Sequence, residues 1–117
     1  MNNTNITRVG TNHIIWQKGF GFYSNELEIM KHRLEEIASR NTTFEVRQQI
    51  EHFQNQIIVQ RNNIDELSHE VNLYIENLSR NLVKAEDQIL LHGKYQDFER
   101  VMNLLRHEFD EFLTKGI

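Results

Sequence analysis

The longest regular pattern of apolar positions runs from Val46 to Leu78, where they recur at alternating steps of four and three. Gln60 is the single clear polar exception, and no Pro or Gly interrupts the run. This spacing places every member on one edge of an α-helix, which other helices must cover. The pattern therefore predicts a long helix near 43–78 inside a bundle, with a seam made of Val46, Ile50, Phe53, Ile57, Gln60, Ile64, Leu67, Val71, Tyr74 and Leu78.

An earlier seam has the same spacing and predicts a helix near 13–40. Gly19 and Gly21 fall inside it, and each Gly weakens a helix by about 1 kcal/mol relative to Ala. Two interpretations stay open: the glycines allow close approach of a neighbouring backbone, or the helix begins near Ser24, which then acts as N-cap. The members of this seam are His13, Trp16, Phe20, Tyr23, Leu27, Met30, Leu34 and Ile37.

Two turns are predicted between these helices and a third one. Thr42, followed three residues later by Glu45, has the pattern of a capping box, and Asn41 suits the left-handed conformation that ends a helix. A connection this short makes the first two helices antiparallel neighbours. The second turn has no Gly or Pro, so helix length places it near 79–81, with Ser79 or Asn81 as cap.

The third seam predicts a helix near 81–115, with a one-residue phase shift at Gly93. This glycine marks a kink, or it splits the segment and gives four helices instead of three. Residues 1–12 lack periodicity and are expected to form a flexible lead. The sequence thus predicts an all-α protein in which residues 13–117 form one antiparallel up-down-up bundle of three long helices. The third seam consists of Leu82, Ala85, Ile89, Leu91, Tyr95, Phe98, Met102, Leu105, Phe109 and Phe112.

Composition narrows the classes of partner. A length of 117 residues suits a single domain. Thirteen Lys and Arg against seventeen Asp and Glu give a net charge of −4, which argues against a nucleic-acid partner. The absence of Cys excludes disulfide and thiolate chemistry. No apolar run is long enough to predict a membrane span, and the Asn- and Thr-rich start does not resemble a signal peptide, so a cytoplasmic location is expected.

Histidines and carboxylates suggest a candidate metal site at one end of the bundle. Folding the chain back at the two turns brings His13, His69 and His92 to one level. His13 continues the first seam and His92 continues the phase of the first part of the third seam, whereas His69 points outward. Imidazole and carboxylate ligands together suit iron, zinc or manganese. The predicted ligands are His13, Glu66, Glu70 and His92, and the alternative is a polar bundle end in which the two histidines satisfy caps or carboxylates.

The remaining histidines are interpreted as solvated. His32 and His107 point away from their seams, and His52 lies on a flank. The segment from Leu67 to Val71 resembles the phosphoacceptor box of sensor histidine kinases around an exposed His69. It lacks the usual proline, and no glycine-rich nucleotide-binding lobe follows it.

Several apolar residues fall outside the seams and predict a surface for a partner. They favour a non-enzymatic helical bundle that acts through protein–protein contacts and forms homo-oligomers. The alternative function is a metal-binding bundle. The residues outside the seams are Ile58, Val59, Leu73, Ile75, Leu90, Val101 and Leu104.

Overall fold

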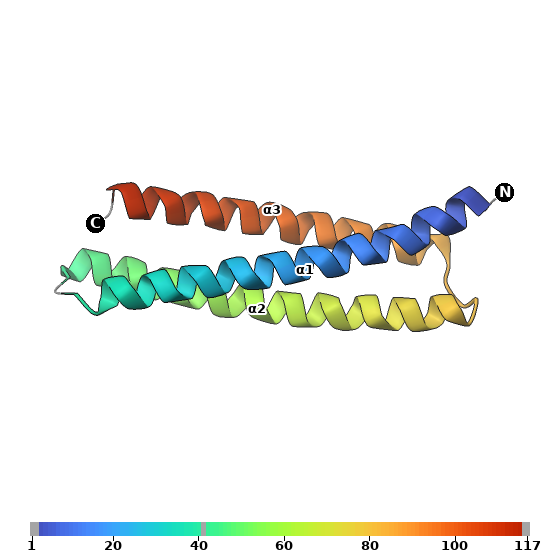
Figure 1. The fold of residues 1–117 in the computed structure, drawn as a ribbon, viewed down its shortest axis with the longest axis horizontal. Helices are drawn as coiled ribbons and strands as arrows, with labels where there is room; N and C mark the ends of the chain where they lie inside the picture. Colours follow the sequence, from blue (N-terminus) through green and yellow to red (C-terminus); the bar gives the residue numbers. More distant parts are fainter. Residues whose placement is uncertain (1–2, 41, 116–117) are drawn as a thin grey trace.

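Three long helices lie side by side in a computed structural model, which describes residues 3–40 and 42–115, with side chains from Asn12 onward. The helices are α1 (Asn3–Ala38), α2 (Phe44–Ser79) and α3 (Ala85–Lys115). α2 runs antiparallel to the other two, so α1 and α3 begin at the same end of a rod of about 62 × 20 × 18 Å (Figure 1). The described residues contain no strand. The predicted all-α, three-helix, up-down-up bundle is confirmed.

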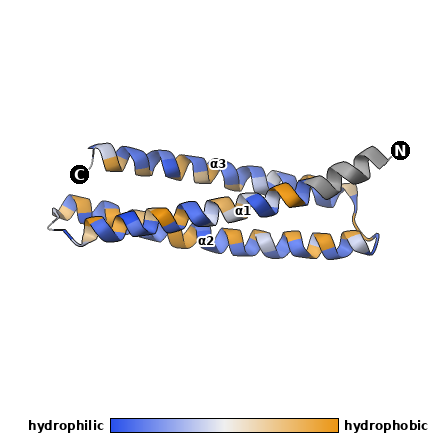
Figure 2. Cartoon of the chain, in the orientation of Figure 1, coloured by the Kyte–Doolittle hydropathy of each residue, from blue (hydrophilic) through white to orange (hydrophobic). Residues whose placement is uncertain are grey.

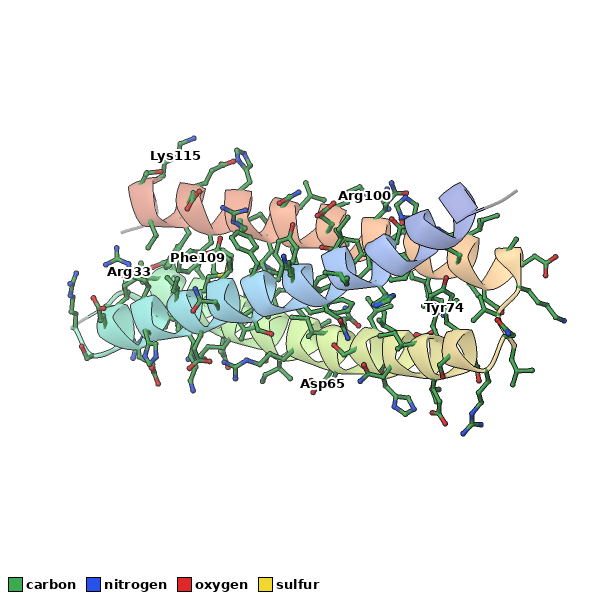
Figure 3. The ribbon with its side chains drawn as sticks, turned by 45° about the vertical axis from the view of Figure 1, so that its right-hand side comes forward. Arg33, Asp65, Tyr74, Arg100, Phe109 and Lys115 are labelled. Atoms are coloured by element: carbon green, nitrogen blue, oxygen red, sulfur yellow. The ribbon has the colours of Figure 1, made fainter. Side chains whose placement is uncertain are left out.

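The core follows the predicted seams closely. Each helix supplies seven buried apolar side chains to one continuous cluster, and Gln60, only 3% exposed, is buried among them. Figure 3 shows Tyr74 and Phe109 directed between the helices, whereas Asp65 and Lys115 project outward. Apolar and polar positions accordingly alternate along each ribbon (Figure 2). Within the described chain, no helix is long and apolar enough to cross a membrane.

The first helix begins earlier than predicted. α1 starts at Asn3 rather than near His13, so the expected lead is helical from that residue onward; residues 1–2 lie outside the described residues. Gly19 and Gly21 both lie within α1, and Ser24 is therefore not an N-cap. The space that a Cβ atom on Gly19 would need is filled by the Tyr95 side chain. The close approach that this glycine allows is thus made by a side chain and not by a neighbouring backbone.

The turn before α2 is capped one residue later than predicted. Thr43 has extended backbone angles (φ −72°, ψ 165°), and its Oγ1 accepts a hydrogen bond of 3.2 Å from the Val46 N–H. This contact satisfies one of the free N–H groups at the start of the helix. The predicted capping box between Thr42 and Glu45 is therefore wrong in register. Asn41 lies outside the described residues.

The second turn ends α2 with a Schellman motif. Asn81 has a φ of 58°, the Leu82 N–H donates to the Asn77 carbonyl at 2.9 Å, and the Asn81 N–H donates to the Leu78 carbonyl at 3.1 Å. α3 then begins only at Ala85. The prediction of a helix from residue 81 is wrong because the backbone makes this motif first.

This late start corrects the first part of the third seam. Because residues 82–84 are not helical, the phase of Leu82 does not continue into α3. Leu82 and Ile89 are 61% and 70% exposed, and the buried seam starts at Leu91. α3 continues through Gly93 without a break, so the structure has three helices in its described part rather than four.

Candidate functional site

The four predicted metal ligands lie in different surroundings. His13 is half-buried, as its place in the first seam predicted. His92 is exposed because it follows the incorrect phase of Leu82 and Ile89, and its ring centroid lies 6.4 Å from that of Trp16. Glu66 is exposed.

The carboxylate of Glu70 is held by Lys94, whose Nζ lies 2.6 Å from Glu70 Oε1. Among the described residues, no three His, Asp or Glu side chains are placed to hold a metal ion together. The site of His13, Glu66, Glu70 and His92 with iron, zinc or manganese therefore stays a prediction, and no geometric feature here adds to it.

The other histidines lie on the outside, as predicted. His32 lies 3.6 Å from Glu28 and 3.2 Å from Glu35 on its own helix, and His107 lies 2.7 Å from Glu111. Exposed pairs of this kind contribute little to stability. His52 differs because its Nε2 reaches Glu108 of α3 at 3.4 Å. It therefore belongs to the contacts that relate α2 to α3.

The bundle end near the chain's N-terminus contains two polar atoms that are buried without a hydrogen-bond partner among the described residues. They are His13 Nδ1 and the Tyr74 hydroxyl oxygen. The Tyr74 ring packs against Trp16, with centroids 6.0 Å apart. Burial raises the pKa of Tyr74, and the negative charge of Asp87 raises it further. Tyr74, which the sequence placed only as a seam residue, thus adds a buried polar group to the same end of the bundle as His13.

Every pair of helices is joined by at least one ion pair. Glu28 of α1 pairs with Arg61 of α2, and Glu26 of α1 pairs with Arg106 of α3 at 2.8 Å. Lys94 and Glu70 join α3 to α2. These contacts bring residues from defined heights of the rod together, so they show the register of the three helices.

Large apolar side chains remain exposed along the rod. Six of the seven residues predicted to lie outside the seams are exposed, whereas Ile75 packs against the core. A further stripe on α1, which was not predicted, has members seven residues apart: Ile15 (53% exposed), Phe22 (51%) and Ile29 (49%). The signal for it was present, because residues seven apart share one line on a helix. Arg106 of α3 lies over the Phe22 ring, with its Cζ 5.7 Å from the centroid.

A groove of about 350 Å³ lies between α2 and α3. Its floor includes Gln60, Leu67 and Phe98, which belong to the core. Its walls combine carboxylate, amide, ammonium and apolar side chains from both helices. The wall residues are Asn63, Glu66, Glu70, Lys94, Asp97 and Val101.

The α1 stripe and the α2/α3 groove are the two surfaces that the geometry singles out. Comparison of the chain with protein-family models, curated proteins and solved structures found no match. These two surfaces are therefore the features of the chain that point to a function.

Proposed function

We propose that this chain is a non-enzymatic helical bundle that acts through protein–protein contacts and self-associates. The observation that carries the proposal is the amount of apolar surface left uncovered. Thirteen large apolar side chains are exposed in the described part, against twenty-one in the core. Scattered exposed apolar residues are ordinary, but residues aligned on one face of a helix are typical of helix–helix contacts.

The α1 stripe supports self-association most directly. Ile15, Phe22 and Ile29 lie on one line of the helix, spaced by two turns, and each is about half exposed. Burial of an Ile or Phe side chain contributes about 1.5–3 kcal/mol. Each half-exposed side chain contributes part of this free energy when it is covered. In a two-fold symmetric contact each residue is buried twice, once from each copy.

Sedimentation of the full chain over a concentration series tests this proposal. Ile29→Gln removes one member of the stripe and is expected to weaken self-association by about ten-fold or more, which corresponds to about 1.4 kcal/mol. Ile58→Gln makes the same change at an exposed site on α2, outside the stripe, and is the matched control. A monomeric parent at high micromolar concentration, or equal effects of the two variants, would contradict self-association through α1.

A further inference from the structure

The outer edges of the α2/α3 groove carry a repeating pattern of apolar and charged residues. On each helix, residues seven apart form one line along the helix. The line on α2 lies on the exposed flank of the helix towards α3, because His52 contacts Glu108 and Glu66 lines the groove. The line on α3 faces α2, because Asp97 lines the groove together with Glu66. The α2 line is His52, Val59, Glu66 and Leu73, and the α3 line is Leu90, Asp97, Leu104 and Glu111.

The antiparallel register aligns these two lines. The contacts between His52 and Glu108 and between Lys94 and Glu70 fix which residues lie at the same height. Three level pairs result, defined here as the Leu73 pair (Leu73 with Leu90), the acidic pair (Glu66 with Asp97) and the Val59 pair (Val59 with Leu104). The acidic pair lines the groove, and the two apolar pairs lie beyond it on the same two lines, one towards each end of the rod and about 21 Å apart for fourteen helical residues.

Both apolar pairs are accessible to a partner. Leu73 and Leu90 are 47% and 59% exposed, and Val59 and Leu104 are 45% and 59% exposed. Val101, which lines the groove near the Val59 pair, is 38% exposed. Covering these side chains would remove apolar surface from water on both sides of the acidic pair.

The middle of the groove carries surplus negative charge. Glu66, Glu70 and Asp97 line it together with a single cation, Lys94. Lys94 pairs with Glu70, and Asp97 accepts a hydrogen bond of 2.8 Å from Arg100 on its own helix. Glu66 makes no ion pair with any other described residue. A partner that covers the groove must therefore bring a positive charge to Glu66, or leave that carboxylate beside apolar surface at a cost.

This charge argues against a second copy of the chain seated groove to groove. In a two-fold arrangement that matches apolar pairs over the whole groove, the acidic pair of one copy faces the acidic pair of the other. Like charges brought together in this way oppose association. The groove is therefore distinct in chemistry from the α1 stripe, whose central residue is Phe22.

We infer that the α2/α3 groove binds an amphipathic helix of another protein, which carries two apolar anchors two heptads apart and a Lys or Arg midway between them. A helix laid in a groove presents anchors on one face at such intervals. The two anchors contact the Leu73 and Val59 pairs, and the cation contacts Glu66 and Asp97. This inference rests on the proposed function, because it assigns one protein contact to a defined surface.

Two synthetic helical peptides of about 24 residues, six to seven turns, test the inference. Both carry leucine at the two anchor positions, and they differ only midway, where one has arginine and the other glutamate. Binding to the full chain is measured by fluorescence anisotropy of the labelled peptide. The arginine peptide is expected to bind at least about ten-fold more tightly than the glutamate peptide, since like charges replace an opposite-charge contact.

Variants of the protein distinguish binding in the groove from general electrostatic attraction of the peptide. Glu66→Lys is expected to weaken binding of the arginine peptide by about ten-fold and to strengthen binding of the glutamate peptide. Asp65→Lys makes the same charge change one residue away, on an exposed side of α2 that points away from the bundle, and is expected to change binding less than about two-fold (Figure 3). Val59→Gln is expected to weaken the binding of both peptides.

The possible results either support or overturn the inference. No binding of the arginine peptide up to about 1 mM overturns it. Equal binding of the two peptides, or equal effects of Glu66→Lys and Asp65→Lys, also overturns it. If sedimentation shows that Val59→Gln changes self-association, the groove is a contact between copies of the chain. This result also overturns the inference. Self-association of the parent is measured on the same samples, so the proposed function can stand while this inference fails.

Discussion

The Tyr95 hydroxyl of α3 occupies the position where a Cβ atom on Gly19 of α1 would lie. Tyr95 is only 7% exposed, and its ring packs edge-on against Phe20, with centroids 5.6 Å apart. The ring therefore has little room to move. Gly19 is needed for this contact between α1 and α3, although a glycine in mid-helix weakens α1 itself.

Gly19→Ala is expected to lower the free energy of unfolding. Ala gains about 1 kcal/mol in helix propensity, but overpacking against a buried ring costs about 1–3 kcal/mol, so a net loss of about 1 kcal/mol follows. Gly21→Ala is the matched control: nothing lies within 4 Å of the added Cβ, so stability should rise by about 0.5–1 kcal/mol. Urea denaturation measures both. Equal stabilisation by the two changes would contradict the packing role of Gly19.

The contact between Gly19 and Tyr95 also shows how much of the fold could be predicted from the sequence. The periodicity of residues 46–78 predicted α2 and its buried Gln60 correctly, because local spacing within one unbroken helix determines which edge is buried. The glycine was visible too, but the side chain that needs it comes from another helix. Sequence spacing alone gives no such neighbour.

The same limit explains the error at His92. Its predicted inward position depended on carrying a helical phase from Leu82 to Ile89, across residues 82–84 that are not helical. A helical phase cannot be carried across such a break, so His92 does not hold the buried seam position that the candidate metal site assumed. The α2/α3 groove was not predicted. Apolar residues outside the seams, Val101 among them, predicted only a partner surface, because a groove between two helices depends on their register.

Asn81 gives a test of the second turn. It has a φ of 58°, a conformation that costs most residues with a Cβ about 1–2 kcal/mol but that Asn and Gly tolerate. Asn81→Ala is therefore expected to lower the free energy of unfolding by about 1 kcal/mol. Asn81→Gly should change it by a few tenths. Thermal unfolding followed by circular dichroism compares them, and an Asn81→Ala variant as stable as Asn81→Gly would exclude a role for the left-handed backbone.

Tyr95 gives a prediction for alkaline pH. Burial and the nearby charge of Glu99 raise the pKa of Tyr95 from 10.0 to about 12. The unfolded chain then loses this proton at lower pH than the folded chain, so stability falls as pH rises from 10 towards 12. The expected loss from this group is about 2 kcal/mol. Denaturation at several pH values measures it.

Tyr95→Phe is the control for this pH dependence, because it removes the titrating hydroxyl while keeping the ring. Its stability should fall less steeply between pH 10 and 12 than that of the parent. Loss of protons from Lys side chains is common to both proteins and cancels in the comparison. Identical pH profiles for the two proteins would show that Tyr95 ionises in the folded chain as easily as in the unfolded chain.

Gln60 tests what a polar residue does inside this core. Its side chain is 3% exposed, and its Oε1 accepts a hydrogen bond of 3.1 Å from Asn63 Nδ2 at the groove wall. Burial of an amide costs free energy that one hydrogen bond offsets only in part. Gln60→Leu is therefore expected to raise the free energy of unfolding by about 1 kcal/mol, since half-buried Asn63 can turn towards water.

Gln54→Leu, at an exposed site on the same helix, is the matched control and should change stability by less than about 0.5 kcal/mol. Urea denaturation of both variants gives the comparison. A less stable Gln60→Leu would mean that the hydrogen bond with Asn63 outweighs the burial of the amide. A more stable variant would instead indicate that Gln60 is retained at the floor of the α2/α3 groove for a reason other than stability, such as fixing the helix register.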